Sequence, residues 1–368
     1  MGQIWGNIEL LFQYPIVNFE IIINGVLIGA LFALAAYGLA LVWGVMNVKN
    51  LAQGDFVIGG GYVSWWLVNN VGIHPLLGIP ISFVAMALLA GALHGTPIHN
   101  FFKARRQLNL GLTLFGAAAI VFPGIAAIFQ ADLGSFGTAS AVVGGSLLTI
   151  MLCVNGGIYD VVISRVIERD LFTSLLATFG IAIMMAQIMN LLFGSDTQSL
   201  DLDYSSVDFA EGVSAPIAKL LGAGLALALA VFVILFMKNS RMGQAIRATA
   251  QDARAARVLG IDTEKVYAFT FSLNAAICGA AGAIIVMVWV IQPFYGITYS
   301  IRAFVIVTAA GLGNLPGVIA AGLGLGAAEQ YGGFIFGIGY QQAIAVLLLL
   351  LVLVFRLMQQ QRNRQVLR

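Results

Sequence analysis

The segment 240–262, SRMGQAIRATAQDARAARVLGID, lies between two long apolar stretches at 215–237 and 266–291. Each flanking stretch is long enough to cross a bilayer, which takes about 20 apolar residues in a helix. Alanine, arginine and glutamine dominate the segment, and all three are good helix formers. Basic loops lie preferentially on the cytoplasmic side of a membrane. The segment therefore predicts two transmembrane helices joined by a helical cytoplasmic loop.

The composition of the whole chain is that of a membrane protein. Of the 368 residues, 60% are hydrophobic and 9% are charged, and the mean hydropathy is +0.95. A soluble domain carries about 25% charged residues, so this chain has too few to cover a water-exposed surface. The 43 glycines suit helices that pack closely through small faces. These properties exclude a soluble globular protein and predict an all-α, polytopic transmembrane helical bundle.

Apolar runs recur along the entire chain. We predict spans at 20–44, 54–71, 77–95, 111–130, 141–162, 171–194, 215–237, 266–291 and 340–356, with a Gly/Pro-broken stretch at 301–333. No loop between these runs is long enough to bury a core, so we expect a single transmembrane domain over 1–368. The sequence also lacks a G-x-x-x-x-G-K-[ST] phosphate loop, so we expect no nucleotide-binding site and no enzymatic activity of its own.

The distribution of charged side chains predicts the orientation. The loop at 196–211 carries only acidic charges and is expected outside, whereas basic residues mark the cytoplasmic loops. These basic residues are Lys103, Arg105, Arg106, Arg165, Arg169, those from Lys238 to Lys265, and Arg356, Arg362, Arg364 and Arg368 in the tail. The alternation predicts an external N-terminus and a cytoplasmic C-terminus, and hence an odd number of crossings.

The stretch at 301–333 cannot then cross the membrane once only. Either it is re-entrant, which gives nine crossings, or Pro316 splits it into two short spans, which gives eleven. We therefore expect a bundle of nine to eleven spans.

The basic loop also carries a specific pattern. Residues 251–261, QDARAARVLGI, resemble the coupling-loop motif of ABC importer permeases of the branched-chain amino acid type. The general importer pattern is Glu-Ala-Ala-x3-Gly, and Arg254 stands at its first position here, a departure that is common within this branch.

Three further regions resemble the same family, in the family's order. The first is 37–45 with 50–55 (NLAQGD) and 60–62 (GGY). The second is 177–180 (ATFG) with 193–195 (FGS). The third is 311–317 (GLGNLPG), which leads to Gly326 and Glu329. They are similar to the family's N-terminal Asn-Phe-Ala-His/Gln-Gly and Gly-x-Tyr pattern, its Thr-x-Gly and Phe-Gly pair, and its Gly-rich region near the C-terminus. The resemblance thus extends over nearly the whole chain.

The resemblance implies a function and an assembly. Such a permease translocates branched-chain amino acids or a similar small polar solute across the bacterial inner membrane, among membrane lipid. It works with ATPase subunits, a second permease subunit and a periplasmic substrate-binding protein, and we expect no nucleic acid, cofactor, metal or catalytic residue. Relatives handle amino acids, urea and short amides, so the resemblance leaves the solute open.

The ATPase would dock on the coupling loop, 238–265. There the resemblance implies close packing at Ala255, Ala256 and Gly260, and polar contacts from Arg247 and Asp252.

Two parts of the chain depart from the family pattern. Residues 95–155 have no recognised counterpart, and their two apolar runs predict an inserted helical hairpin that leaves the downstream orientation unchanged. The usual Pro-x-Gly after Phe355-Arg356 is replaced by 357–359, LMQ.

Polar residues near the apolar spans are candidates for the translocation path: Asn50, Gln53, Thr178 and Asn314. Two interpretations of the stretch with Asn50, Gln53 and Asp55 stay open. It is either a loop at the cytoplasmic membrane surface, or a kink whose polar groups line the inner end of the path or brace the bend. Asp55 must face protein, water or the boundary, because a carboxylate in hydrocarbon is costly.

Other functions remain as alternatives. An ion-coupled secondary transporter would carry ionisable groups deep within its spans, whereas nearly all charges of this chain fall in predicted loops. A scaffolding membrane protein is a third class, and the broken stretch at 311–317 argues against it. Glu329, after a run of small residues, is either interfacial or a buried anchor at a helix seam.

Overall fold

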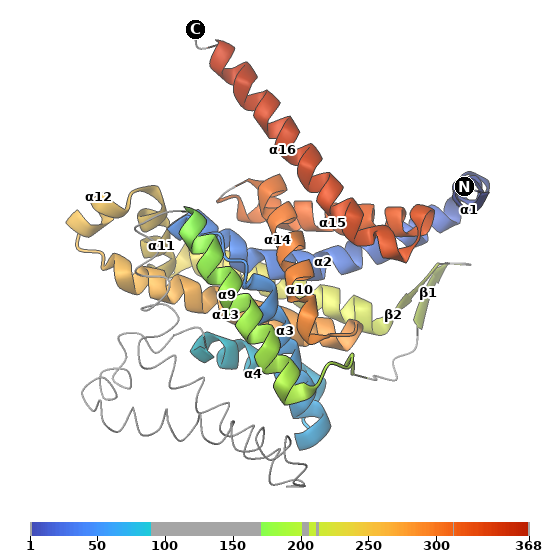
Figure 1. The fold of residues 1–368 in the computed structure, drawn as a ribbon, viewed down its shortest axis with the longest axis horizontal. Coiled ribbons are helices and arrows are strands. Elements are labelled where there is room, and N and C mark those ends of the chain that lie inside the picture. Colours follow the sequence, from blue (N-terminus) through green and yellow to red (C-terminus); the bar gives the residue numbers. More distant parts are fainter. Residues whose placement is uncertain (1, 90–170, 201–205, 211–212, 312, 367–368) are drawn as a thin grey trace.

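The computed structural model describes residues 2–89, 171–200, 206–210, 213–311 and 313–366, and these form an all-α bundle with one small hairpin (Figure 1). The helices are α1 (Gly2–Gln13), α2 (Pro15–Met46), α3 (Gln53–Trp66), α4 (Pro75–Leu89), α9 (Leu171–Phe193), α10 (Ile217–Asn239), α11 (Arg241–Gln251), α12 (Ala253–Val258), α13 (Thr263–Val288), α14 (Gly296–Ala310), α15 (Leu315–Phe336) and α16 (Gln341–Val366). A π-helical turn at Leu67–Val71 extends α3, and 3-10 turns at Pro293–Tyr295 and Ile338–Tyr340 precede α14 and α16.

Several helices have the length and apolarity of membrane spans. Among the described residues these are Pro15–Met46, Ile217–Asn239, Thr263–Val288, Pro293–Ala310 and Ile338–Phe355, with shorter apolar helices at Pro75–Leu88 and Thr178–Phe193. The predicted polytopic all-α bundle is therefore confirmed.

The helix bounds agree closely with most of the predicted spans. The clearest differences lie near the C-terminus: α16 continues to Val366, beyond the predicted end at 356, and the stretch at 301–333 is divided between α14 and α15. The predicted spans at 111–130 and 141–162, and the whole of the predicted hairpin at 95–155, lie outside the described residues.

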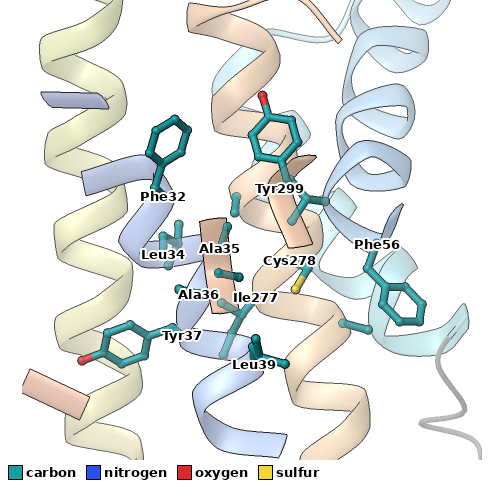
Figure 2. Close-up of a cluster of buried hydrophobic side chains, with 14 of the residues drawn as sticks. Phe32, Leu34, Ala35, Ala36, Tyr37, Leu39, Phe56, Ile277, Cys278 and Tyr299 are labelled. Atoms are coloured by element: carbon teal, nitrogen blue, oxygen red, sulfur yellow. The ribbon is translucent and has the colours of Figure 1, made fainter. Parts of the chain in front are cut away.

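Helix α2 forms the centre of the bundle. It contacts α10, α13, α14 and α15, and its residues from Ile28 to Val42 are buried without a polar face. A helix that is apolar all round belongs in a protein core or a membrane. Figure 2 shows part of this core, with Phe32, Ala35 and Tyr37 from α2 beside Ile277 and Cys278 of α13.

Glycines permit the closest helix crossings. A Cβ added to Gly25 of α2 would lie 2.6 Å from the Cα of Ala327 in α15, and one added to Gly322 of α15 would lie 2.5 Å from the Cβ of Ala33. At the crossing of α3 and α13, a Cβ on Gly282 would lie 2.7 Å from the backbone nitrogen of Gly61. In lipid, such small-residue seams stabilise helix pairs because the backbones come into direct van der Waals contact.

The two ends of α10 carry different structures (Figure 1). Before α10, strands β1 (Ser206–Ala210) and β2 (Val213–Pro216) form an antiparallel hairpin that pairs Val207 with Ala215. After α10, the chain turns at Ser240 into α11 and α12. A helix of this length spans about 34 Å, so the acidic loop and the basic loop are held at opposite ends of the bundle.

Candidate coupling loop and polar centre

The basic loop begins with a capped, amphipathic helix. The Ser240 hydroxyl accepts a hydrogen bond from the Gly243 backbone N–H at 2.8 Å, which caps α11. Gly243, Ile246 and Thr249 recur every three residues and are the buried face of α11, which contacts α2, α10 and α13. Arg247 donates from its guanidinium to the carbonyl oxygen of Met237, so it ties α11 back to α10.

Helix α12 is a short exposed turn with a cap at each end. The Asp252 carboxylate accepts from the N–H groups of Arg254 and Ala255 at 2.8 and 3.0 Å. These backbone N–H groups, Ala255 first, hold the pKa of Asp252 below its ordinary value. At the other end, Gly260 has φ +86°, its N–H bonds to the Arg257 carbonyl, and the Ile261 N–H bonds to the Ala256 carbonyl, each at 3.0 Å.

This pair of bonds is the Schellman arrangement, which favours glycine because it needs a left-handed residue after the helix. A Cβ at Gly260 would meet nothing within 4 Å. The backbone conformation therefore explains the glycine at this position, and the open space beside it leaves room for another surface to approach.

The tip of α12 presents apolar side chains to solvent. Val258 is 87% exposed and Leu259 is 79% exposed, and Ala255 beside them is also exposed. Ala256, by contrast, is only 2% exposed, so it faces the body of the protein. Arg257 donates from Nε to the Thr263 hydroxyl at 2.8 Å, which fastens α12 to the start of α13. The loop is thus internally braced and leaves its apolar tip largely exposed.

A second polar region lies inside the bundle, where the chain between α2 and α3 is unwound. Asn47 ends α2 with φ 53°, and residues 47–52 lead back into the bundle before α3 begins at Gln53. Asn50 and Gln53 are completely buried. Gln53 donates from Nε2 to the carbonyl oxygen of Ala35 in α2 and lies 2.7 Å from the Cys278 sulfur in α13.

The depth of this region excludes a loop at the membrane surface. Cys278 lies fifteen residues beyond the first residue of α13, about 22 Å along a helix that rises 1.5 Å per residue. Figure 2 shows Ala35 and Cys278 close together within the buried cluster. Of the two interpretations of this stretch, the kink inside the bundle agrees with the structure.

Neighbouring helices hold the unwound segment by side-chain hydrogen bonds. The Ser300 hydroxyl on α14 donates to the Leu51 carbonyl at 2.6 Å and accepts from the Gly54 N–H at 2.8 Å. Thr178 on α9 accepts from the Leu51 N–H at 3.1 Å. Three of the predicted path residues thus meet at one unwound segment: Asn50 lies in it, Gln53 follows it directly, and Thr178 is bonded to it.

Asn314, the fourth predicted path residue, lies elsewhere. Its side chain caps α15 by accepting from the Gly317 N–H at 3.1 Å, and it is exposed. The preceding residue, Gly313, lies against Gly44 near the C-terminal end of α2. The structure therefore places Asn314 at the end of the bundle that also carries α11.

Charged residues also lie inside the bundle, contrary to the expectation that nearly all charges are in loops. Asp55 on α3 is 3% exposed. Arg302 on α14 donates from Nε to both carboxylate oxygens of Glu329 on α15, at 2.9 and 3.1 Å. Glu329 is therefore a buried anchor at a helix seam. Arg302 was missed because it interrupts an otherwise apolar run, and its partner follows 27 residues later, across a helix break.

Comparison with known proteins identifies the family. The family described as the permease component of branched-chain amino acid transport systems matches residues 21–122 and 106–357. The high-affinity branched-chain amino acid transport permease BraD of Pseudomonas aeruginosa is 26% identical over 340 residues, covering 91% of this chain and 92% of that protein.

Further relatives agree. LivH of Escherichia coli K12, of the same description, is 26% identical over 331 residues, covering 88% of this chain and 89% of that protein. A probable LivH permease of Methanocaldococcus jannaschii is 26% identical over 326 residues, covering 87% of this chain and 84% of that protein. No solved structure matches the chain. The chain belongs to the family of permease components of branched-chain amino acid transport systems.

Proposed function

We propose that this chain is the permease subunit of an ATP-driven ABC importer that carries branched-chain amino acids or a similar small polar solute across the bacterial inner membrane. The observation that carries the proposal is the braced, basic loop with an exposed apolar tip at Val258 and Leu259. An isolated membrane protein gains nothing from such a tip in water, whereas a partner that covers it removes about 25 cal/mol of unfavourable hydration for each Å² buried. Family membership supports an ATPase as that partner.

The coupling loop, 238–265, is the ATPase docking element in this proposal. Leu259, Val258 and Ala255 contact the ATPase. Asp252 and Gly260 hold the shape of α12 through its caps, and Arg247 fixes α11 to α10. Ala256 supports α12 by packing against the body of the protein, where it is buried.

The arrangement of the ends supports an orientation. The basic loop is cytoplasmic, the acidic hairpin at the other end of α10 is periplasmic, and the substrate-binding protein delivers solute there. The N-terminal helix α1 lies at the end opposite α12 (Figure 1), which agrees with an external N-terminus. A second permease subunit completes the pore, and the unwound segment with Asn50, Gln53 and Thr178 lies along or beside it. The C-terminus is cytoplasmic, and the segment 95–155 is an inserted helical hairpin.

Co-purification tests the docking assignment. The permease carrying Leu259→Ser is solubilised from native membranes, and its partners are identified by mass spectrometry beside those of the wild type. We expect wild type to recover an ATPase and a second permease, and the variant to lose the ATPase while keeping the second permease.

Ile338→Ser is the matched control. Ile338 is 80% exposed, almost the same as Leu259, but it follows α15 at the opposite end of the bundle. Loss of the ATPase from both variants, or from neither, contradicts docking at α12.

An ion-coupled carrier is the second candidate, because Asp55 and Glu329 are carboxylates buried within helices. Such groups mark proton and ion pathways in many transporters. Uptake that follows a proton or sodium gradient and persists without the ATPase would favour this candidate. Uptake that needs ATP hydrolysis favours the importer.

A further inference from the structure

The buried ion pair Arg302–Glu329 occupies the middle of the bundle. The guanidinium carbon of Arg302 lies 4.6 Å from the centre of the Phe32 ring on α2, and Phe32 is midway along the predicted span 20–44. The side chains of Arg302 and Glu329 are 10% and 4% exposed. Two charges are thus held at a depth where isolated charges are costly.

Stability alone gives little reason to keep such a pair. Desolvation offsets most of the attraction in a buried ion pair, and apolar residues of similar volume are often as stable or more so. Helices α14 and α15 also already contact one another and α2, and α15 meets α2 through small residues. An ionisable pair inside a membrane bundle is therefore best explained by a solute that it recognises.

The guanidinium has a free edge. Within the described part of the chain, Arg302 is hydrogen-bonded only through Nε, both times to Glu329, so Nη1 and Nη2 have no hydrogen-bond partner. These two groups point in parallel, and two parallel N–H donors match the two oxygens of a carboxylate. Glu329 fixes the plane of the guanidinium and thereby the direction in which this edge points.

Aromatic rings surround the pair. Tyr299 lies edge-on to Phe32 with ring centres 6.3 Å apart, and Trp289 stacks on Phe32 at 6.4 Å. Figure 2 shows Phe32 and Tyr299 at the same end of the buried cluster, on different helices. Trp289 stands where α13 ends and the chain unwinds before α14. A cation beside such rings suits a solute with a charged end and an apolar end.

We propose that Arg302 binds the carboxylate of the transported solute, with Glu329 as its positioning residue and Phe32, Tyr299 and Trp289 beside the apolar part. This assignment rests on the proposed function and extends it, because a site with a free guanidinium edge selects carboxylate-bearing amino acids over urea and neutral amides. A neutral solute leaves the guanidinium edge unpaired and loses the charge-assisted bonds.

Binding to the solubilised complex of permease and ATPase, without the substrate-binding protein, tests the assignment. Radiolabelled leucine is the probe, and unlabelled leucine, leucinamide and urea are the competitors. We expect leucine to compete best and leucinamide, which lacks the carboxylate, to compete about 10- to 150-fold more weakly. Equal competition by leucine and leucinamide, or no leucine binding by the wild type, overturns the proposal.

Two variants separate recognition from packing. Arg302→Lys keeps the charge beside Glu329 but loses the fork, and we expect leucine binding to weaken about 10- to 150-fold. Arg302→Met with Glu329→Leu removes both charges in an apolar setting. A purely structural pair predicts normal leucine binding in this folded double variant, whereas the proposal predicts that binding is lost.

Lys219→Met is the matched control. Lys219 is a half-buried cation on α10 that donates to Asn24 at 3.0 Å, away from the ion pair, and its loss should leave leucine competition unchanged. ATP-dependent leucine uptake by the complete transporter is measured in parallel. Uptake by the wild type without leucine binding at this site refutes the Arg302 assignment and leaves the importer standing. Absence of ATP-dependent uptake refutes the importer itself.

Discussion

The centre of the bundle and the coupling loop both depend on small residues, but for different physical reasons. Where α2 crosses α15, Gly25 and Gly322 are small because another backbone or side chain occupies the space of a Cβ. At the end of α12, Gly260 has open space around it and is a glycine because φ is +86°. A pattern of alanine and glycine therefore has two explanations, and only coordinates separate them.

The difference extends to what each region does with its polar groups. In the centre, Gln53, Ser300 and Arg302 satisfy backbone and side-chain partners in other segments of the bundle. In the loop, Ser240 and Asp252 satisfy the N–H groups of their own helices. The centre is consequently stabilised by contacts between distant segments, whereas the loop is a local structure that displays a surface.

The largest effect is expected from breaking the ion pair on one side only. Glu329→Leu leaves the Arg302 charge buried without its partner, and this should lower the free energy of unfolding by about 3–5 kcal/mol. Unfolding of the purified permease by a denaturing detergent measures the change. Adding Arg302→Met should restore most of the stability, and a single variant as stable as the double would contradict a buried charge.

A smaller loss is expected where backbones meet. Gly54→Ala places a Cβ 2.6 Å from the carbonyl carbon of Gly296 and 2.8 Å from the Ser300 nitrogen, so α3 and α14 must move apart. Such overpacking typically costs about 1–3 kcal/mol. The same unfolding titration measures it.

Gly224→Ala is the control for that variant, because a Cβ there meets nothing within 4 Å. Alanine should stabilise α10 by about 1 kcal/mol or less through helix propensity. If both substitutions act alike, contact at the seam is not the reason for Gly54.

At the loop, a glycine substitution should impair docking while the bundle stays folded. Gly260→Ala forces a Cβ into the left-handed region at a cost of about 1–2 kcal/mol, and the strain is relieved by fraying of the exposed turn α12. We expect reduced ATPase recovery in the co-purification assay and an unchanged unfolding transition. Gly260→Asn should retain more ATPase, because asparagine tolerates this conformation. Equal losses in the two variants would show that side-chain size at Gly260, and not its φ, controls docking.

The sequence predicted the fold well because membrane spans are long apolar runs with strong length constraints. Helices α2, α10 and α13 begin and end within a few residues of the predicted spans. The helical loop was also predictable from its composition. Pro316 indicated the break between α14 and α15, but it did not distinguish a re-entrant stretch from two short spans.

The candidate site was less predictable because its residues meet through the fold. Gln53 bonds to Ala35 and Cys278 from two other helices, and no sequence spacing links them. The pairing of Arg302 with Glu329 depends on α14 and α15 forming a hairpin. The sequence did not predict the exposure of single residues either. Ala255 and Ala256 are neighbours of the same type, but only Ala256 is buried.

The smallest effect is expected from acidification, which should weaken the cap of α12 and leave the cap of α11 unchanged. The pKa of Asp252 is lowered from 3.8 by the N–H groups of Ala255 and Arg254. A lowered folded-state pKa means that the cap of α12 is complete above pH 3.8 and is lost as the pH falls through the folded-state value. Ser240, which caps α11, is a hydroxyl and does not titrate in this range.

Amide hydrogen exchange, expressed as protection relative to the free peptide at each pH, compares the two caps directly. Protection at Arg254 and Ala255 should fall on acidification while protection at Gly243 stays level. Asp252→Asn keeps the acceptor without its charge, so protection of α12 should become independent of pH in that variant. Parallel loss at both caps would mean that the loop unfolds as one unit, which contradicts two separately capped helices.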